Sequence, residues 1–293
     1  ATEVQNVMYK TYDEVGGRLA SGLVSWWALE LSSLYTDSTG TNDGTNAGST
    51  QSGYDTLYGG NTPVIPRAID NAPTVQADAI GAGSALFVAS NTDYIECGND
   101  SSLQVSTGDF TICAWAKKDT VGTAEVVVMY GDSDDPRWFL GFNSSNKVEF
   151  LADDTDAYTQ FLSTATYTDL DWHHHAVTFD RNGGSAGVKL YADGVLESSG
   201  DGDSQSKTLN HATYGLRIGT RTHGGSGAMD RPFDGNICQV GLWDAVLDQA
   251  QIQSVMEKTY EELTASEKED LVSYWALDVD GSDSHGDNDG TLT

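Results

Sequence analysis

The most informative stretch of this chain runs from Asp169 to Gly194 and reads Asp-Leu-Asp-Trp-His-His-His-Ala-Val-Thr-Phe-Asp-Arg-Asn-Gly-Gly-Ser-Ala-Gly-Val-Lys-Leu-Tyr-Ala-Asp-Gly. Apolar and polar residues alternate in two runs within it. Val177 and Phe179 share one face of the first run, and Val188 and Leu190 share one face of the second. A period of two is typical of strands that are buried on one side. The Asn-Gly-Gly at 182–184 supplies the positive φ angles that a tight connection needs. We therefore predict an antiparallel hairpin inside an all-β domain.

The same stretch resembles a known family. Trp172-His173-His174 before the first strand, and Leu190-Tyr191-Ala192-Asp193-Gly194 in the second, resemble the signature of laminin-G-like, concanavalin A-type jelly rolls. The resemblance extends from about Leu23 to Ile252. It implies an all-β, concanavalin A-like (laminin-G-like) antiparallel jelly-roll β-sandwich with short flanking helices. Around the hairpin at 172–193, strands are expected near 85–89, 93–97, 110–117, 125–130, 137–142, 147–151, 158–162, 214–219 and 235–243.

A narrower resemblance lies upstream. Tyr58-Gly59-Gly60-Asn61-Thr62-Pro63 and Asp70-Asn71-Ala72-Pro73 are similar to segments of such modules in structural proteins of marine bacteriophages, mostly fibre or decoration components. This resemblance implies a virion role.

Composition excludes some classes of partner. The chain has 44 Asp and Glu against 15 Lys and Arg, a formal charge of −29, so it repels nucleic acid and anionic membranes. No run of apolar residues is long enough to span a membrane, and residues 1–22 lack the apolar core of a signal peptide. The acidic excess indicates either solubility in a salty medium or cation binding in acidic loops.

An internal repeat organises the chain. Leu23-Val24-Ser25-Trp26-Trp27-Ala28-Leu29 returns as Leu271-Val272-Ser273-Tyr274-Trp275-Ala276-Leu277, and the turn at 37–45 returns at 283–291. We therefore expect one complete module, residues 23–248, and in residues 271–293 the first strand and turn of a second, incomplete repeat. An apolar strand needs a cover, so we expect residues 271–293 to be held by a neighbouring molecule. The alternative is that they fold back on their own module.

Helical linkers are expected on both sides of the module, at 1–22 and 249–270. Ile252, Val255 and Leu263 fall near one stripe of a helix over 249–263. Asp248 with Gln251 three residues later resembles a capping box that begins it.

Calcium is the one cofactor that we expect. Hard cations bind carboxylate and carbonyl oxygens of acidic turns, and the candidate ligands are Asp37, Asn42, Asp43, Asp132, Asp134 and Asp135. The alternative is that these residues cap the backbone of their own turns. Related sandwiches often carry a calcium site near the closing strand, but here Cys238 and Gln239 stand where acids are expected.

A glycan site needs an exposed aromatic ring for stacking beside polar hydrogen-bonding groups. The residues with these properties in or next to predicted loops are Arg137, Trp138, Tyr158, Arg221, His223, Asp230 and Arg231. Trp138 begins a strand pattern and is equally consistent with the core. Trp115, Trp172 and Trp243 are predicted core residues.

The sequence contains neither a complete zinc site nor the catalytic motif of related hydrolases. His173 and His175 share a strand face, but zinc needs a third ligand and usually a fourth. The Glu-x-Asp-x-x-Glu of related hydrolases does not occur, so we expect no enzyme. Cys97, Cys113 and Cys238 are expected to be buried free thiols, with one disulfide as the alternative.

These observations lead to one principal hypothesis. We expect a structural and adhesive module of a virion or extracellular fibre or decoration protein, located on the virion surface or outside the cell. Its expected partners are further copies of itself, other virion proteins and host-surface glycans. The alternatives are a secreted carbohydrate-binding, lectin-like module and a glycoside hydrolase.

Overall fold

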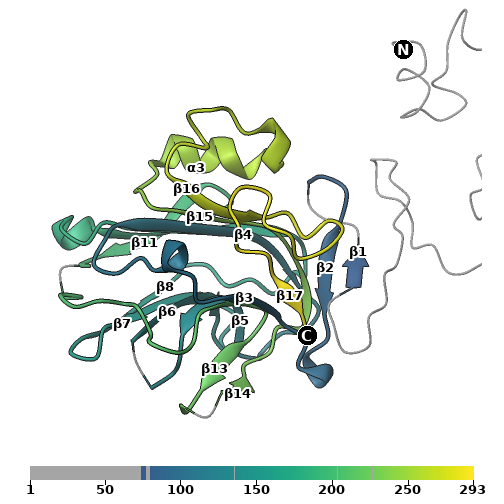
Figure 1. The fold of residues 1–293 in the computed structure, drawn as a ribbon, viewed down its shortest axis with the longest axis horizontal. Helices are drawn as coiled ribbons and strands as arrows, with labels where there is room; N and C mark the ends of the chain where they lie inside the picture. Colours follow the sequence, from purple (N-terminus) through teal and green to yellow (C-terminus); the bar gives the residue numbers. More distant parts are fainter. Residues whose placement is uncertain (1–73, 77–79, 135, 203, 226) are drawn as a thin grey trace, which may run out of the picture. The chain divides into compact units, whose positions relative to one another are not determined.

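The computed structural model describes residues 74–76, 80–134, 136–202, 204–225 and 227–293 (Figure 1). The chain divides into two compact units, residues 1–63 and 64–293, and the described residues all belong to the second. The predicted linker at 1–22 and the predicted opening strand at 23–29 therefore lie outside the described residues.

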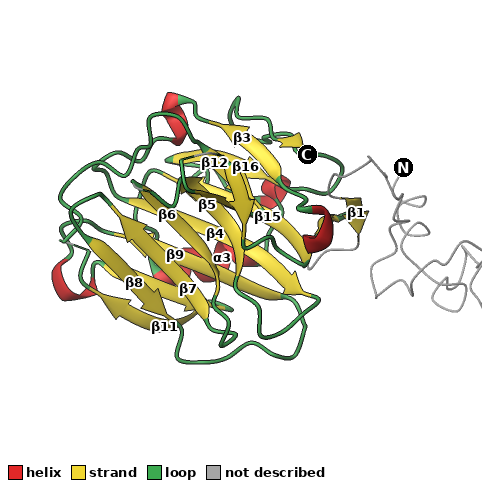
Figure 2. Cartoon of the chain, turned by 90° about the horizontal axis from the view of Figure 1, so that it is seen from below, coloured by secondary structure: helices red, strands yellow, loops and turns green. Residues whose placement is uncertain are grey.

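The described unit is a sandwich of two antiparallel sheets with a small separate hairpin (Figures 1 and 2). The eight-stranded sheet has the order β1 (Thr74–Gln76), β2 (Ser84–Phe87), β15 (Gly235–Trp243), β4 (Phe110–Lys118), β9 (His173–Phe179), β10 (Val188–Ala192) and β11 (Val195–Gly200), with β16 (Leu271–Trp275) paired to β15. The seven-stranded sheet has the order β17 (Thr291–Leu292), β3 (Ile95–Gly98), β12 (Leu216–Ile218), β5 (Glu125–Gly131), β6 (Arg137–Phe142), β7 (Val148–Asp153) and β8 (Tyr158–Leu162). The separate hairpin consists of β13 (Arg221–His223) and β14 (Ala228–Asp230). This architecture confirms the predicted all-β jelly-roll sandwich.

Helical structure among the described residues is short. The α-helix α3 spans Gln249–Met256, and single 3₁₀ turns occupy Ala89–Asn91, Ser101–Leu103, Gly184–Ala186 and Tyr260–Glu262. The predicted capping box is confirmed, because the Asp248 side chain accepts from the Gln251 amide while the Gln251 side chain accepts from the Asp248 amide. The helix is shorter than the predicted 249–263, and residues 264–270, the remainder of the predicted helical linker, contain no helix. No helix in the described part of the chain has the length and apolarity needed to cross a membrane.

The predicted hairpin lies at the centre of the core. Phe179 pairs with Val188, and Val177 with Leu190. All four side chains are fully buried between the sheets. The ring of Phe110 stacks on that of Phe179 at a centroid distance of 5.2 Å. Full burial of such side chains contributes about 1.5–3 kcal/mol each, so this hairpin stabilises both layers of the sandwich.

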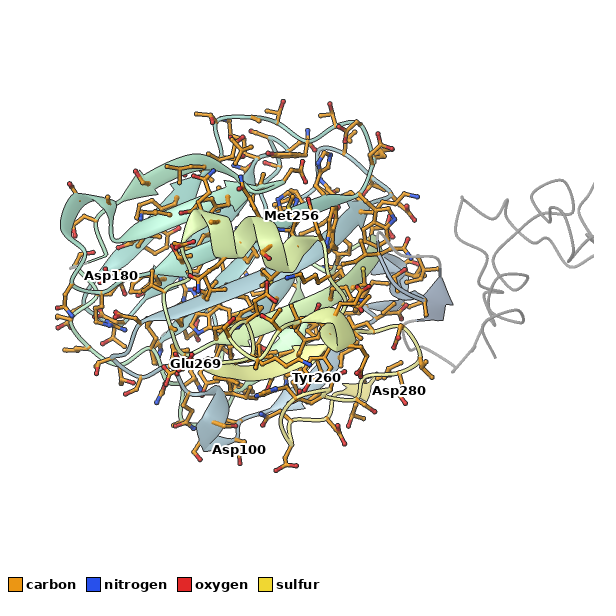
Figure 3. The ribbon with its side chains drawn as sticks, turned by 90° about the horizontal axis from the view of Figure 1, so that it is seen from above. Asp100, Asp180, Met256, Tyr260, Glu269 and Asp280 are labelled. Atoms are coloured by element: carbon orange, nitrogen blue, oxygen red, sulfur yellow. The ribbon has the colours of Figure 1, made fainter. Side chains whose placement is uncertain are left out.

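The outer face of the eight-stranded sheet is covered rather than open. The helix α3 lies across it (Figure 3), and Ile252 and Val255 pack with Trp243 and Leu271 in a second apolar cluster. The Trp115 indole donates to the carbonyl of Met256 at 3.0 Å, which ties the end of the helix to β4. Among the described residues, no helix covers the outer face of the opposite sheet.

Residues 271–293, which we call the tail, complete the same sandwich. β16 pairs with the second half of β15, and β17 pairs with β3. Trp275 is fully buried in the main core, and Leu277 is 1% exposed. The prediction that the tail is held by a neighbouring molecule is therefore wrong, and the alternative of folding back on its own module is what the structure shows. The burial of Trp275 explains this outcome, because folding back places its side chain in the main core of the same sandwich.

The predicted core tryptophans differ in burial. Trp243 is fully buried, whereas Trp115 and Trp172 are only partly buried. Trp172 precedes β9, so its side chain lies at the margin of the sheet. Cys97, Cys113 and Cys238 are buried free thiols, and burial raises the pKa of Cys113 to about 12, which keeps that thiol neutral.

Candidate functional site

The outer face of the seven-stranded sheet brings polar residues of three adjacent strands together. Along β6 and β7, Trp138, Phe150 and Ala152 point into the core, so the intervening residues point outward. Arg137 lies opposite Asp153, which lies opposite Tyr158. We call the outward residues of this region the outer cluster: Arg137, Glu149, Asp153, Tyr158 and Gln160, together with Arg231 from the loop after β14.

An apolar layer supports the outer cluster. Val126, Met129, Phe139 and Leu151 form a separate buried group on the same side of the sheet, each no more than 4% exposed. The Arg231 guanidinium lies over the Phe139 ring at 5.7 Å from its centroid. The charged groups therefore stand on a dry apolar layer, where electrostatic interactions are stronger than in water.

Ion pairs fix the positions of the charged groups. Arg137 Nη2 lies 3.0 Å from Asp153 Oδ2, and Arg231 Nη1 lies 3.2 Å from Glu149 Oε2. The Gln160 amide donates to the other oxygen of Glu149. Glu149 is only 3% exposed, so it depends on both donors to offset its desolvation. The cluster is thus a preorganised set of donors and acceptors.

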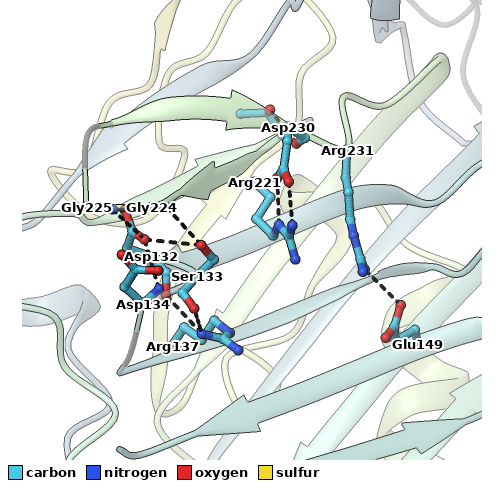
Figure 4. A network of polar contacts seen from close by, with 11 residues as sticks. Asp132, Ser133, Asp134, Arg137, Glu149, Arg221, Gly224, Gly225, Asp230 and Arg231 are labelled. Carbon is cyan, nitrogen blue, oxygen red and sulfur yellow. Dashed lines mark hydrogen bonds and ion pairs between the residues drawn. The ribbon is translucent and has the colours of Figure 1, made fainter.

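Hydrogen bonds join two loops next to this face (Figure 4). Asp132 Oδ1 accepts from the amide of Asp134 at 3.0 Å, and Asp132 Oδ2 accepts from the amide of Gly225 at 3.2 Å. The hydroxyl of Ser133 accepts from the amide of Gly224 at 3.0 Å, and the Arg137 guanidinium donates to the Ser133 carbonyl. The turn after β5 and the hairpin β13–β14 therefore hold each other.

Tyr158 is the exposed aromatic residue of the cluster. It lies on the edge strand β8 and is 57% exposed. Desolvation of the hydroxyl raises the pKa of Tyr158, Glu149 adds to the rise, and Arg137 and Arg231 oppose it. The phenol is neutral at physiological pH, so it offers a flat ring face and a hydroxyl that donates and accepts.

The structure brings together some of the predicted glycan residues and separates others. Arg137, Tyr158 and Arg231 belong to the outer cluster. Arg221 pairs in bidentate fashion with Asp230 inside the hairpin, and His223 is exposed at its tip. The prediction that Trp138 contributes to a glycan site is wrong, because its side chain is fully buried in the sandwich core and cannot stack on a ligand.

Sequence reasoning missed Glu149, Asp153 and Gln160. Glu149 and Gln160 lie on strands predicted at 147–151 and 158–162, where a search for polar residues at the outward positions of neighbouring strands would have found them. Asp153 lies two residues beyond the first predicted strand, which the structure extends to that residue. Their proximity depends on the pairing of β7 with β8.

The calcium candidates are only partly described. Asp37, Asn42, Asp43 and Asp135 lie outside the described residues. The described pair, Asp132 and Asp134, belongs to the turn of Figure 4, where backbone amides occupy the Asp132 oxygens. Across the described ranges, no group of three or more His, Cys, Asp and Glu residues could hold a metal ion.

The two positions of the closing strand at which acids are expected hold no acidic side chain. Cys238 is buried, and Gln239 has a φ of 51° at the irregularity in β15. The Gln239 side chain accepts from the Tyr274 hydroxyl at 2.9 Å. The irregularity in β15 therefore places the neutral side-chain amide of Gln239 against Tyr274 of β16.

The backbone positions of the two carboxylates in the outer cluster are farther apart than the carboxyl groups of a glycosidase. Glu149 and Asp153 are four residues apart on one strand, which is about 13 Å at 3.3 Å per residue. Glycosidases hold their carboxyl groups about 5–9.5 Å apart. Each carboxylate is also engaged by an arginine.

Two solved structures are similar to this chain. A candidate carbohydrate-binding protein from Bacteroides ovatus is similar with a TM-score of 0.53 and 18% identity, over 72% of this chain and 57% of that one. The carbohydrate-binding module (CBM40) of a Ruminococcus gnavus sialidase has a TM-score of 0.45 and 18% identity, over 55% of this chain and 92% of that one.

A curated relative matches part of the chain. The sushi, von Willebrand factor type A, EGF and pentraxin domain-containing protein 1 of Rattus norvegicus is 34% identical over 96 residues, which is 32% of this chain and 3% of that protein. This chain thus spans a small part of the rat protein and just over half of the Bacteroides ovatus protein.

A sequence profile described as the concanavalin A-like lectin/glucanases superfamily (Laminin_G_3) matches residues 89–253. The matched range begins before β3 and ends within α3, so it contains strands of both sheets and all six residues of the outer cluster. The chain belongs to the concanavalin A-like lectin/glucanase superfamily.

Proposed function

We propose that this chain is a non-catalytic glycan-binding module whose binding site is the outer cluster on the seven-stranded sheet. The observation that carries the proposal is the exposed ring of Tyr158 beside fixed hydrogen-bonding groups of Arg137, Glu149 and Arg231. Sugar rings present apolar C–H faces for aromatic contact and hydroxyl groups for bidentate bonds to carboxylates, amides and guanidinium groups.

The name of the Bacteroides ovatus structure supports this proposal. That protein is described as carbohydrate-binding, and it shares the fold with this chain. The structure and charge of the outer cluster supply an independent reason, because its donors and acceptors are already held in place and pay little ordering entropy on binding.

A structural or adhesive role in a virion or fibre is a second proposal, and it is compatible with glycan binding. It rests on the resemblance of residues 58–73, which lie outside the described residues. A glycan-binding face would serve adhesion to a host surface, and the location on a virion or outside the cell stays a prediction.

A glycan array probed with the full chain, followed by titration calorimetry on the best ligand, tests the proposal. Tyr158→Ala should weaken binding at least about tenfold, because loss of a central aromatic contact typically costs 2 kcal/mol or more. Gln160→Ala should weaken it as well. Val279→Ala is the matched control, since Val279 is 60% exposed, close to the 57% of Tyr158, and lies in the tail. An array without any bound glycan, or equal effects of Tyr158→Ala and Val279→Ala, would refute the proposal.

A further inference from the structure

The charged groups of the outer cluster form two ion pairs. Arg137 Nη2 lies 3.0 Å from Asp153 Oδ2, and these two side chains are 9% and 10% exposed. Arg231 Nη1 lies 3.2 Å from Glu149 Oε2, and these two side chains are 30% and 3% exposed (Figure 4). Each guanidinium therefore faces one carboxylate of the protein, and the charges of the two pairs cancel.

The guanidinium of Arg137 is occupied by the protein itself. Besides its ion pair with Asp153, it donates through Nη1 to the carbonyls of Ser133 and Asp132. A ligand anion would reach this guanidinium only by displacing one of these acceptors. A displaced Asp153 would be a buried carboxylate without its counter-charge, which is strongly unfavourable. Arg137 therefore holds the turn after β5 in place and does not recognise an anion.

Arg231 is the more accessible of the two arginines, but its partner Glu149 is the most buried of the four charged side chains. The Gln160 amide donates to the other oxygen of Glu149, so this carboxylate accepts from one neutral and one charged donor. A ligand carboxylate that took Arg231 would leave Glu149 with the neutral donor alone. An anion that instead joined the pair would lie beside the charge of Glu149 and would be repelled.

The charge of the whole chain adds to this local effect. The formal net charge is −29, so the approach of a polyanion is unfavourable before it reaches the outer cluster. A sugar hydroxyl meets neither obstacle. It donates to a carboxylate oxygen and accepts from a guanidinium N–H without separating the two groups, because a paired carboxylate and a paired guanidinium both keep further hydrogen-bonding positions.

We propose that the ligand of the outer cluster is a neutral glycan, whose hydroxyl groups contact the two ion pairs, and that the same ion pairs exclude acidic sugars. This inference rests on the proposed function, and it narrows the ligand to chains of uncharged hexoses or pentoses. Units that carry a carboxylate or a sulfate are excluded at the contacted positions, although the cluster contains two arginines.

A glycan array gives the first test. It carries neutral oligosaccharides of glucose, mannose, galactose and xylose, and acidic oligosaccharides of glucuronate, galacturonate and sulfated galactose. The glycans that bind the parent protein and are lost in Tyr158→Ala should be neutral. Raising the salt from about 50 mM to about 500 mM should change their affinity by less than about twofold, because no ion pair forms with the ligand.

Calorimetry with two forms of one ligand measures the exclusion. The first is the strongest neutral binder of the array, and the second is its partial sulfate ester, with the acetyl ester of the same degree as a control for bulk. The sulfate ester should bind at least about tenfold more weakly than the acetyl ester, because its charge is repelled and its bulk is similar. This comparison uses the parent protein and needs no substitution.

Glu149→Gln tests whether the ion pair is the cause. The variant keeps a side chain of the same length and removes the charge that faces Arg231. It should bind the sulfate ester at least about tenfold more tightly than the parent does, since Arg231 then has no carboxylate to give up. Asp287→Asn is the matched control, because it makes the same change of charge at an exposed residue of the tail. It should change that affinity by less than about twofold, and thermal melts establish that both variants are folded.

The outcomes separate this inference from the proposed function. Acidic glycans that bind in preference to neutral ones, and that Tyr158→Ala removes, would leave a glycan site on the outer cluster and overturn its selectivity for neutral ligands. An equal gain in Glu149→Gln and Asp287→Asn would overturn the role of the ion pair. An array without a bound glycan, or binding that Tyr158→Ala does not weaken, would refute the proposed function and this inference together.

Discussion

Replacement of His175 by leucine should stabilise the protein. His175 is 1% exposed, and neither ring nitrogen has a hydrogen-bond partner among the described residues. Its ring meets the rings of Phe142 at 5.1 Å and Tyr167 at 5.2 Å, both edge to face. A buried polar group without a partner costs about 1–3 kcal/mol, and the lost ring contacts are worth about 0.5–1.5 kcal/mol. The net gain in the free energy of unfolding at pH 7 should be about 1 kcal/mol.

The gain should increase as the pH falls. Burial lowers the pKa of His175 to about 3, with the neighbouring His173 as a further cause. Because the folded-state pKa lies below the unfolded value of about 6.5, protons bind the unfolded chain first, and stability is lost from about pH 6.5 downward. Between pH 7 and pH 5 the parent should lose about 2 kcal/mol through this residue. The leucine variant should not show that loss.

Urea denaturation at pH 7 and at pH 5 measures both effects. His175→Gln is the matched control, because it retains a buried polar group but cannot titrate. It should match the leucine variant in its pH dependence and be less stable than that variant at both pH values. A leucine variant that is less stable than the parent at pH 7, with a difference that does not change at pH 5, would refute this reasoning.

Two further predictions concern charged groups. His173 lies between Asp193, at 2.7 Å, and Asp169, at 3.0 Å, and hydrogen bonding to Asp193 and Asp169 raises its pKa to about 9 against the opposing effect of burial. Since the folded-state pKa is above the unfolded value, the stabilisation is complete below about pH 6.5 and is lost as the pH rises through 9. Thermal melts at a series of pH values should show this loss in the parent and not in His173→Gln. The same pH dependence of the melting temperature in both proteins would contradict the prediction. Asp132→Ala should cost about 1–2 kcal/mol through lost turn hydrogen bonds, equally in calcium and in chelator. A cost confined to calcium-containing buffer would instead make Asp132 a metal ligand.

The sequence predicted the parts of the fold that depend on local pattern. The β9–β10 hairpin is visible because Val177, Phe179, Val188 and Leu190 alternate with polar residues, and the start of α3 is visible because its capping box is local. Trp172 was placed in the core wrongly, since alternation does not reveal that β9 begins one residue later.

The outer cluster and the tail depend on contacts between distant residues. Whether Glu149 and Gln160 meet is fixed by strand register, which single-strand patterns do not contain. Sequence similarity of residues 271–277 to residues 23–29 shows what kind of strand they form, but not which sandwich they join. In both cases the missing information is the identity of the neighbouring strand.

The position of Tyr158 on β8, the last strand of its sheet, has a consequence for the length of a ligand. In the part of the chain that the structure describes, no further strand lies beside β8 in the seven-stranded sheet, so a polymer seated on the ring can continue past this edge of the sheet. Under the proposed function, recognition there would not require a chain end. Internal units of a long polysaccharide would suit this location as well as terminal ones, and several molecules of the protein could occupy one strand of such a polymer.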